Sequence, residues 1–168
     1  MSILGSDVHT EKSPDGDRTL QKGKAVHLMT LIRRLKGKAI LFGFLADTVG
    51  TLASATALIF AMAAAGIPTK EITLRMGGFS GLTLMLIVGL GFTFFGGYVA
   101  GRSARQAEIL HGAAVAGIGL VLGLFFRESG LPLWYEIVSF AAAVPIGMAG
   151  GYLAKEGSAK RILPGSES

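Results

Sequence analysis

The sequence predicts an all-α membrane protein: a four-transmembrane-helix bundle built as two tandem helical hairpins, with both termini cytoplasmic. Hydrophobic residues make up 51% of the chain and charged residues 16%, and the charges avoid four long apolar blocks. A run of about 20 apolar residues spans a bilayer core of about 30 Å. The blocks cover residues 39–65, 77–101, 107–126 and 133–154. They are continuously apolar rather than alternating, which predicts helices and not a barrel.

The lysines and arginines predict which ends face the cytoplasm. Thirteen of the sixteen precede the first block, lie between the second and third, or follow the fourth. Only Lys70, Arg75 and Arg127 lie in the two remaining loops. This is a positive-inside bias. The pI of 9.7 therefore reflects topology and attraction to the lipid bilayer, and we expect no nucleic-acid partner.

The segments that flank the transmembrane domain (39–154) are polar. Residues 1–18 mix both signs of charge, which predicts a disordered cytoplasmic tail. Residues 19–38 place apolar side chains at helical spacing among basic ones, which predicts an amphipathic basic interfacial helix. That helix is either a plain basic flank that sets topology or an element that senses lipid or docks a partner. Residues 155–168 are expected to form a second cytoplasmic tail.

The first block carries one acidic residue, Asp47. It lies nine residues past Lys38, hence about 13 Å along a helix and close to the bilayer midplane, where a carboxylate is costly. Its helical neighbours are small or weakly polar: Gly43, Gly50, Thr51 and Ser54. Two interpretations stay open. Asp47 clamps helices together through hydrogen bonds, or Asp47 and Thr51 belong to a proton or cation site.

The third block opens with Glu108 and His111, the other candidate ion- or proton-binding residues. His111 lies six residues past Arg105, about 9 Å inside, so its depth is within a helical turn of Asp47. If the first and third helices touch, the two side chains form a pair that holds its charge more cheaply than either alone. The alternatives for His111 are a structural role, a proton relay, or ligation of a haem or pigment. We expect no cofactor and no metal.

Small residues recur every three or four positions in the two middle blocks. The second block has Gly89, Thr93, Gly97 and Gly101, and the third has Gly112, Ala116, Gly119 and Gly123. Such faces bring helix backbones close together in lipid, so we expect Gly89, Gly97, Gly101, Gly112 and Gly119 to be helix-packing residues. The alternative is a pathway lined by glycine.

The fourth block follows a short loop. Trp134 and Tyr135 belong to an expected aromatic belt. Glu136 is expected on a solvated face within reach of Arg127, and Pro145 is expected to kink the helix.

The two halves of the chain resemble each other. Residues 96–105 read GGYVAGRSAR, and residues 150–160 read GGYLAKEGSAK. The first and third blocks also begin alike, since Gly43 and Gly50 align with Gly112 and Gly119. This pattern predicts a duplicated hairpin with parallel topology, an arrangement that transporters use.

Two stretches carry a resemblance to a known group. GFLADTVGT (43–51) and GGYVAGRSARQAEILHG (96–112) resemble a set of small four-helix bacterial membrane proteins whose function is uncharacterised. The resemblance implies a multi-pass protein of the bacterial inner (plasma) membrane. It supplies no catalytic residues.

No reactive signature occurs in the chain: there is no P-loop, no HExxH and no Gly-x-Ser-x-Gly, and cysteine is absent. We therefore expect a non-enzymatic integral membrane protein. The first prediction is an accessory, scaffold or assembly component, packing through its glycine faces as a homo-oligomer or within a larger membrane complex. The alternative is a small oligomeric transporter, or a proton- or cation-coupled permeation protein, that uses Asp47 and His111.

Overall fold

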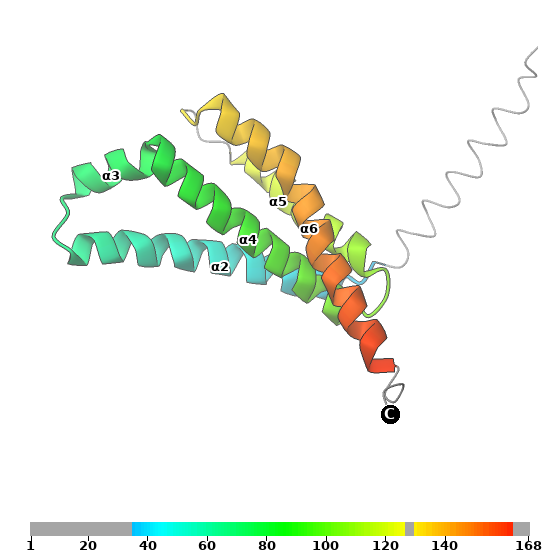
Figure 1. The fold of residues 1–168 in the computed structure, drawn as a ribbon. Helices are drawn as coiled ribbons and strands as arrows, with labels where there is room; N and C mark the ends of the chain where they lie inside the picture. The colour runs from blue at the N-terminus through cyan, green and yellow to red at the C-terminus, as the bar shows by residue number, and fades with distance from the viewer. Residues whose placement is uncertain (1–34, 127–129, 163–168) are drawn as a thin grey trace, which may run out of the picture. The chain divides into compact units, whose positions relative to one another are not determined.

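A computed structural model of the chain describes residues 35–126 and 130–162, with side chains described as far as Gly157. These residues are all-helical and include no strand. The helices are α2 (Gly37–Ala64), α3 (Thr69–Gly77), α4 (Phe79–Ala104), α5 (Glu108–Phe125) and α6 (Leu133–Ile162) (Figure 1). The predicted tail (1–18) and nearly all of the predicted amphipathic helix (19–38) lie outside the described residues.

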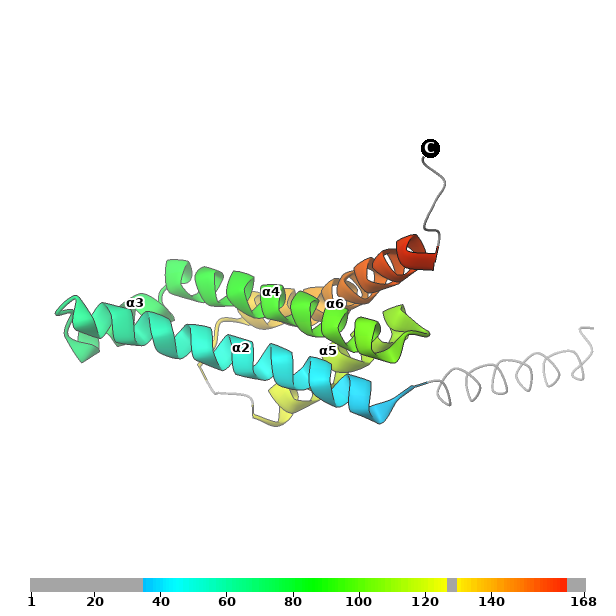
Figure 2. The same ribbon diagram turned by 90° about the horizontal axis from the view of Figure 1, so that it is seen from below.

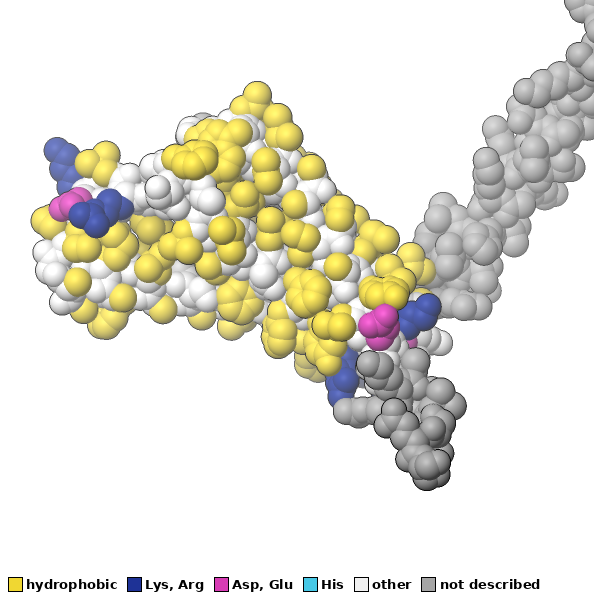
Figure 3. Space-filling view, in the orientation of Figure 1, with side chains coloured by type: hydrophobic (Ala, Val, Ile, Leu, Met, Phe, Trp, Pro, Cys, Tyr) yellow, Lys and Arg dark blue, Asp and Glu magenta, His cyan; other side chains and the backbone are white. Residues whose placement is uncertain are grey.

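Four of the helices, α2, α4, α5 and α6, are long and apolar enough to cross a membrane. An all-helical chain with four such segments is therefore confirmed. In Figure 3 the charged side chains gather at the two ends of the bundle, and hydrophobic side chains cover the surface between them. That distribution is expected when lipid rather than water surrounds the middle of the helices.

The helix bounds agree with the apolar blocks except at two places. Residues 66–76, expected to be a plain loop, contain α3 instead. An ion pair of 2.6 Å joins Glu71 in its first turn to Arg75 in its last, and both charges suit the helix dipole. The last helix continues to Ile162, past the predicted end at Ala154, because the basic segment that follows the apolar block is also helical.

Close contacts give the direction of each helix. Gly43 of α2 faces Gly96 of α4, and Gly50 faces Phe92, so these two helices are antiparallel. Along α4, Gly97 faces Gly147 of α6, and Gly101 faces Gly151 four residues later, so α4 and α6 run the same way. Figures 1 and 2 show α2 beside α4, with α6 crossing α4.

The two halves of the bundle differ in packing. We call the half that contains the α4–α5 connection the closed half. Most of the described buried residues lie there, among them Ala100, Ala104, Val115 and Ala154, each with 0% exposure. Residues 121–126, at the far end of α5, are all exposed. We call this other half the open half, and the site described next begins where the closed half ends.

The connection between α4 and α5 is short. Arg105 and Ala107 adopt left-handed backbone conformations with φ of 55° and 49°, and the Arg105 amide donates a hydrogen bond to the Gly101 carbonyl at 3.2 Å. The chain therefore reverses direction in one tight turn, which brings α5 back against α4.

Candidate functional site

A cavity lined by residues from all four long helices lies in the described chain. It has a volume of about 510 Å³ and is not enclosed. Its lining includes Asp47 of α2, Thr93 of α4, Gly119 of α5 and Tyr135 of α6. A cavity of this volume falls in the range of small-molecule sites, which is about 300–1,000 Å³.

The cavity exists because the small-residue faces of α4 and α5 continue beyond the place where these helices pack closely against α6. In the closed half, a side chain added at Gly97 would collide with Gly147, and one added at Gly112 would collide with Gly147 and Gly151. In the open half, Gly89 has no atom within 4 Å of the place where a side chain would begin. The same faces that join the helices at one end therefore leave a space at the other.

Asp47 stands at the inner end of this cavity. It lies ten residues past Gly37, hence about 15 Å along α2. The Thr93 hydroxyl donates a hydrogen bond to Asp47 Oδ1 at 3.3 Å. Asp47 Oδ2 lies 3.9 Å from the point where a side chain at Gly119 would begin. Asp47 is half-buried, and the residues described in the cavity lining include no Lys, Arg or His.

Hydroxyl groups also line the cavity, together with aromatic and aliphatic side chains. Thr48 and Thr51 follow Asp47 along α2, and Ser139 and Tyr135 face them from α6. The Ser139 hydroxyl donates to the Glu136 carbonyl at 3.0 Å. Within the described part of the chain, the Tyr135 hydroxyl has no hydrogen-bond partner. Among these groups only Thr51 was predicted as a site residue; Thr48, Thr93, Tyr135 and Ser139 were not. Thr93 belongs to the small-residue face of the second block, and its spacing there predicted only helix packing.

His111 lies elsewhere, buried in the closed half with 0% exposure. The Lys36 backbone amide donates to its Nε2 at 2.9 Å, and its Nδ1 lies 3.0 Å from the Ala107 carbonyl oxygen. An amide N–H is only a donor, so Nε2 must accept and Nδ1 must carry the proton. Both ring nitrogens are thus engaged, and neither is free to coordinate a haem iron or to pair with Asp47.

The predicted meeting of Asp47 with His111 is therefore wrong. The physical reason lies in the register of α2 and α5. The parallel helices bring Asp47 level with Gly119, two turns beyond His111, which instead meets the start of α2. The Lys36 side chain strengthens that junction, because its Nζ donates to the Ala104 carbonyl at 3.0 Å and places a cation at the end of α4.

The remaining candidate residues divide between the two halves. Glu108 lies in the closed half, where it begins α5 and its Cβ lies 3.2 Å from the point where a side chain at Gly101 would begin. Thr51 lines the cavity with Asp47. The predicted packing glycines divide in the same way: Gly97, Gly101 and Gly112 make close contacts, whereas Gly89 and Gly119 line the cavity.

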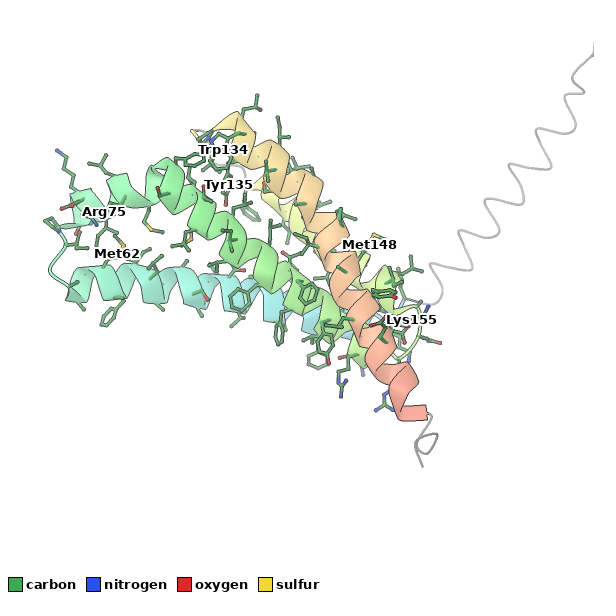
Figure 4. The ribbon with its side chains drawn as sticks, in the orientation of Figure 1. Met62, Arg75, Trp134, Tyr135, Met148 and Lys155 are labelled. Carbon is green, nitrogen blue, oxygen red and sulfur yellow. The ribbon has the colours of Figure 1, made fainter. Side chains whose placement is uncertain are left out.

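The environment predicted for Glu136 is also wrong. It was expected on a solvated face, but only 8% of it is exposed, because the start of α6 packs against its neighbours. The nearby aromatic residues explain part of this packing. The Trp134 ring lies 5.1 Å from that of Phe79, at the start of α4 (Figure 4). The expected partner Arg127 lies outside the described residues.

Within residues 35–126 and 130–162, no group of three or more His, Cys, Asp or Glu side chains is placed to hold a metal ion. Comparison of the chain with family models, with curated proteins and with solved structures gives no match. The described lining of the cavity offers one carboxylate, several hydroxyls and an apolar wall.

Proposed function

We propose that the chain is a non-enzymatic multi-pass membrane protein that acts as a small carrier or permeation unit, with Asp47 as the group that binds a proton or a cation. The observation that supports this is a cavity of about 510 Å³ within four apolar helices, with Asp47 as the one acidic residue in its described lining. A carboxylate at membrane depth is costly unless a proton, a cation or hydrogen bonds neutralise it. The hydroxyl of Thr93 reaches both carboxylate oxygens, at 3.3 and 3.5 Å, and one neutral donor at these lengths leaves most of that cost for a ligand to offset.

The arrangement of the helices suits transport. We propose two tandem hairpins, α2 with α4 and α5 with α6, with both termini and the α4–α5 connection in the cytoplasm of a bacterial cell. Gly43 packs on Gly96 within the first hairpin, and Gly112 packs on Gly147 within the second. The bias in Lys and Arg supports this orientation. Repeated halves that meet at a binding site provide a route to alternating access, in which one half rocks against the other.

The scaffold function is the second candidate. One observation favours it: α2 leaves large apolar side chains exposed, including Phe42 (61%), Val49 (59%) and Leu52 (63%). Lipid or a partner helix would cover them, as in a homo-oligomer or a larger membrane complex. Against it, the glycines expected to bind a partner at positions 97, 101 and 112 are already in contact within the chain.

Reconstitution into liposomes separates the two candidates. Wild type is compared with Asp47→Asn, which keeps the side-chain shape and removes the charge, and with Glu71→Gln, which removes a carboxylate from α3 outside the cavity. Proton or cation flux is measured under a pH gradient, and oligomeric state is measured on the same samples. The carrier predicts flux in wild type and Glu71→Gln and none in Asp47→Asn. Absence of flux from all three, with assembly lost in Asp47→Asn, would support the scaffold.

A further inference from the structure

We infer that the natural ligand of the cavity is an amphipathic organic cation, with a positively charged head beside Asp47 and an apolar body along the open half. This inference rests on the proposed function, because it takes the cavity around Asp47 to be the binding site. It names the class of ligand, which the carrier proposal leaves open.

The charge of the ligand follows from the lining. Among the described lining residues, Asp47 is the one acidic side chain and none is basic. A neutral or anionic ligand would supply no counter-charge to an ionised Asp47 at membrane depth, so the carboxylate would have to take up a proton instead, whereas a cation neutralises it directly. Tyr135, in the same lining, is the other titratable residue, and its hydroxyl offers hydrogen bonding rather than charge.

The volume of the cavity and its apolar wall indicate that the ligand has an apolar body. A bare metal ion would find too few ligands here. Ca²⁺, for example, takes about six to eight oxygen ligands, and Asp47 is the single carboxylate in the described lining. Such an ion would also leave most of the roughly 510 Å³ empty. Leucines and aromatic rings line that space, including Phe44, Phe126 and Phe140. Aromatic faces attract organic cations, and apolar walls favour a bulky apolar substituent.

The chain carries its own reporter for this binding. Trp134 is the one tryptophan, and its ring lies 5.8 Å from that of Tyr135, which lines the cavity. Figure 4 shows the two residues together at the start of α6. Occupation of the cavity should therefore change the fluorescence of Trp134.

Two ions of the same shape and opposite charge test the inference on the full chain in zwitterionic detergent. Tetraphenylphosphonium is the cationic probe and tetraphenylborate is its anionic counterpart. We expect a saturable change in Trp134 fluorescence with the cation, at least tenfold tighter than with the anion. Asp47→Asn should remove that preference. No saturable response to the cation, or equal affinity for both ions, overturns the inference.

A second pair of variants tests the same inference if Asp47→Asn fails to fold. Gly89→Leu places a side chain in the cavity, whereas Gly91→Leu makes the same change on the same helix at an exposed position outside it. We expect Gly89→Leu to weaken the cation at least tenfold and Gly91→Leu to bind as wild type does. Equal binding by both variants overturns the inference.

Failure of this inference can be distinguished from failure of the carrier proposal. If flux in liposomes depends on Asp47 but tetraphenylphosphonium does not bind, the cavity serves a proton or an inorganic cation, and only the present inference fails. If Asp47 does not affect flux, the carrier proposal fails on its own measurement.

Discussion

Lys36 and His111 show how two residues can join three helix ends. The Lys36 amide bonds to His111 at the start of α5, and the Lys36 side chain bonds to the last carbonyl of α4. Helix ends leave backbone groups without partners, so contacts of this kind stabilise the closed half. We therefore infer a structural role for His111, which is to hold the start of α2 against the start of α5.

A prediction follows for His111→Ala. The substitution removes the acceptor of the part-buried Lys36 amide and the packing of a ring that is 0% exposed, a combined loss of about 1–3 kcal/mol. We expect a lower temperature of unfolding in detergent and unchanged Asp47-dependent flux in liposomes. Lost flux with unchanged unfolding temperature would contradict this role and favour a proton relay through His111.

At this scale the sequence predicted Asp47 better than His111. The depth of Asp47 and its small neighbours were visible in the spacing of the first block, and the structure places it among Gly96, Gly119 and Thr93. The partners of His111 are backbone groups of Lys36 and Ala107. Any residue type supplies such groups, so no sequence pattern could identify them.

At the scale of helices, the face of small residues on α4 has two physical outcomes. Gly97 and Gly101 meet α6 backbone to backbone, whereas Gly89 and Thr93 border an empty space. Small side chains allow close contact where helices cross and leave a gap where they diverge. The spacing predicted the face, but not the crossing point, because that depends on how all four helices pack.

Substitution along α4 tests this division. We expect Gly97→Val to lower the free energy of unfolding by about 1–3 kcal/mol, because the added groups would collide with Gly147 in a well-packed contact. Gly91→Val, on the same helix with no atom within 4 Å, is the matched control. Chemical unfolding of both variants in detergent measures the difference. Equal stability would show that the α4–α6 contact is loose.

The helix that the sequence missed, α3, illustrates a limit of hydropathy patterns. It has nine residues and one buried side chain, Ile72. So short an element has too few turns to show a period, and its stability depends on packing and on the Glu71–Arg75 pair. The four long helices, by contrast, can be predicted from the length and composition of their apolar segments alone.

At the scale of the whole molecule, the direction of the helices makes a testable statement about sidedness. Because α4 and α6 run the same way, the α4–α5 connection and the end of α6 should face the same side of the membrane. We expect reporter fusions after Arg105 and after Ser168 to be cytoplasmic, and a fusion after Gly66 to be external. Fusions after Arg105 and Ser168 on opposite sides would exclude the tandem hairpins.

The central claim is that the cavity around Asp47 is an accessible binding site within the membrane domain. The chain has no cysteine, so single cysteines can be introduced without background. Thr51 lines the cavity, whereas Val49 is 59% exposed on the same helix and outside the cavity. A thiol must ionise to react, which lipid prevents and an open cavity allows.

The most direct measurement is the rate at which a water-soluble cationic thiol reagent modifies Thr51→Cys and Val49→Cys in sealed vesicles. We predict rapid modification of Thr51→Cys, slowed by tetraphenylphosphonium, and little modification of Val49→Cys. No modification of Thr51→Cys, or equal rates at both positions, would contradict the account.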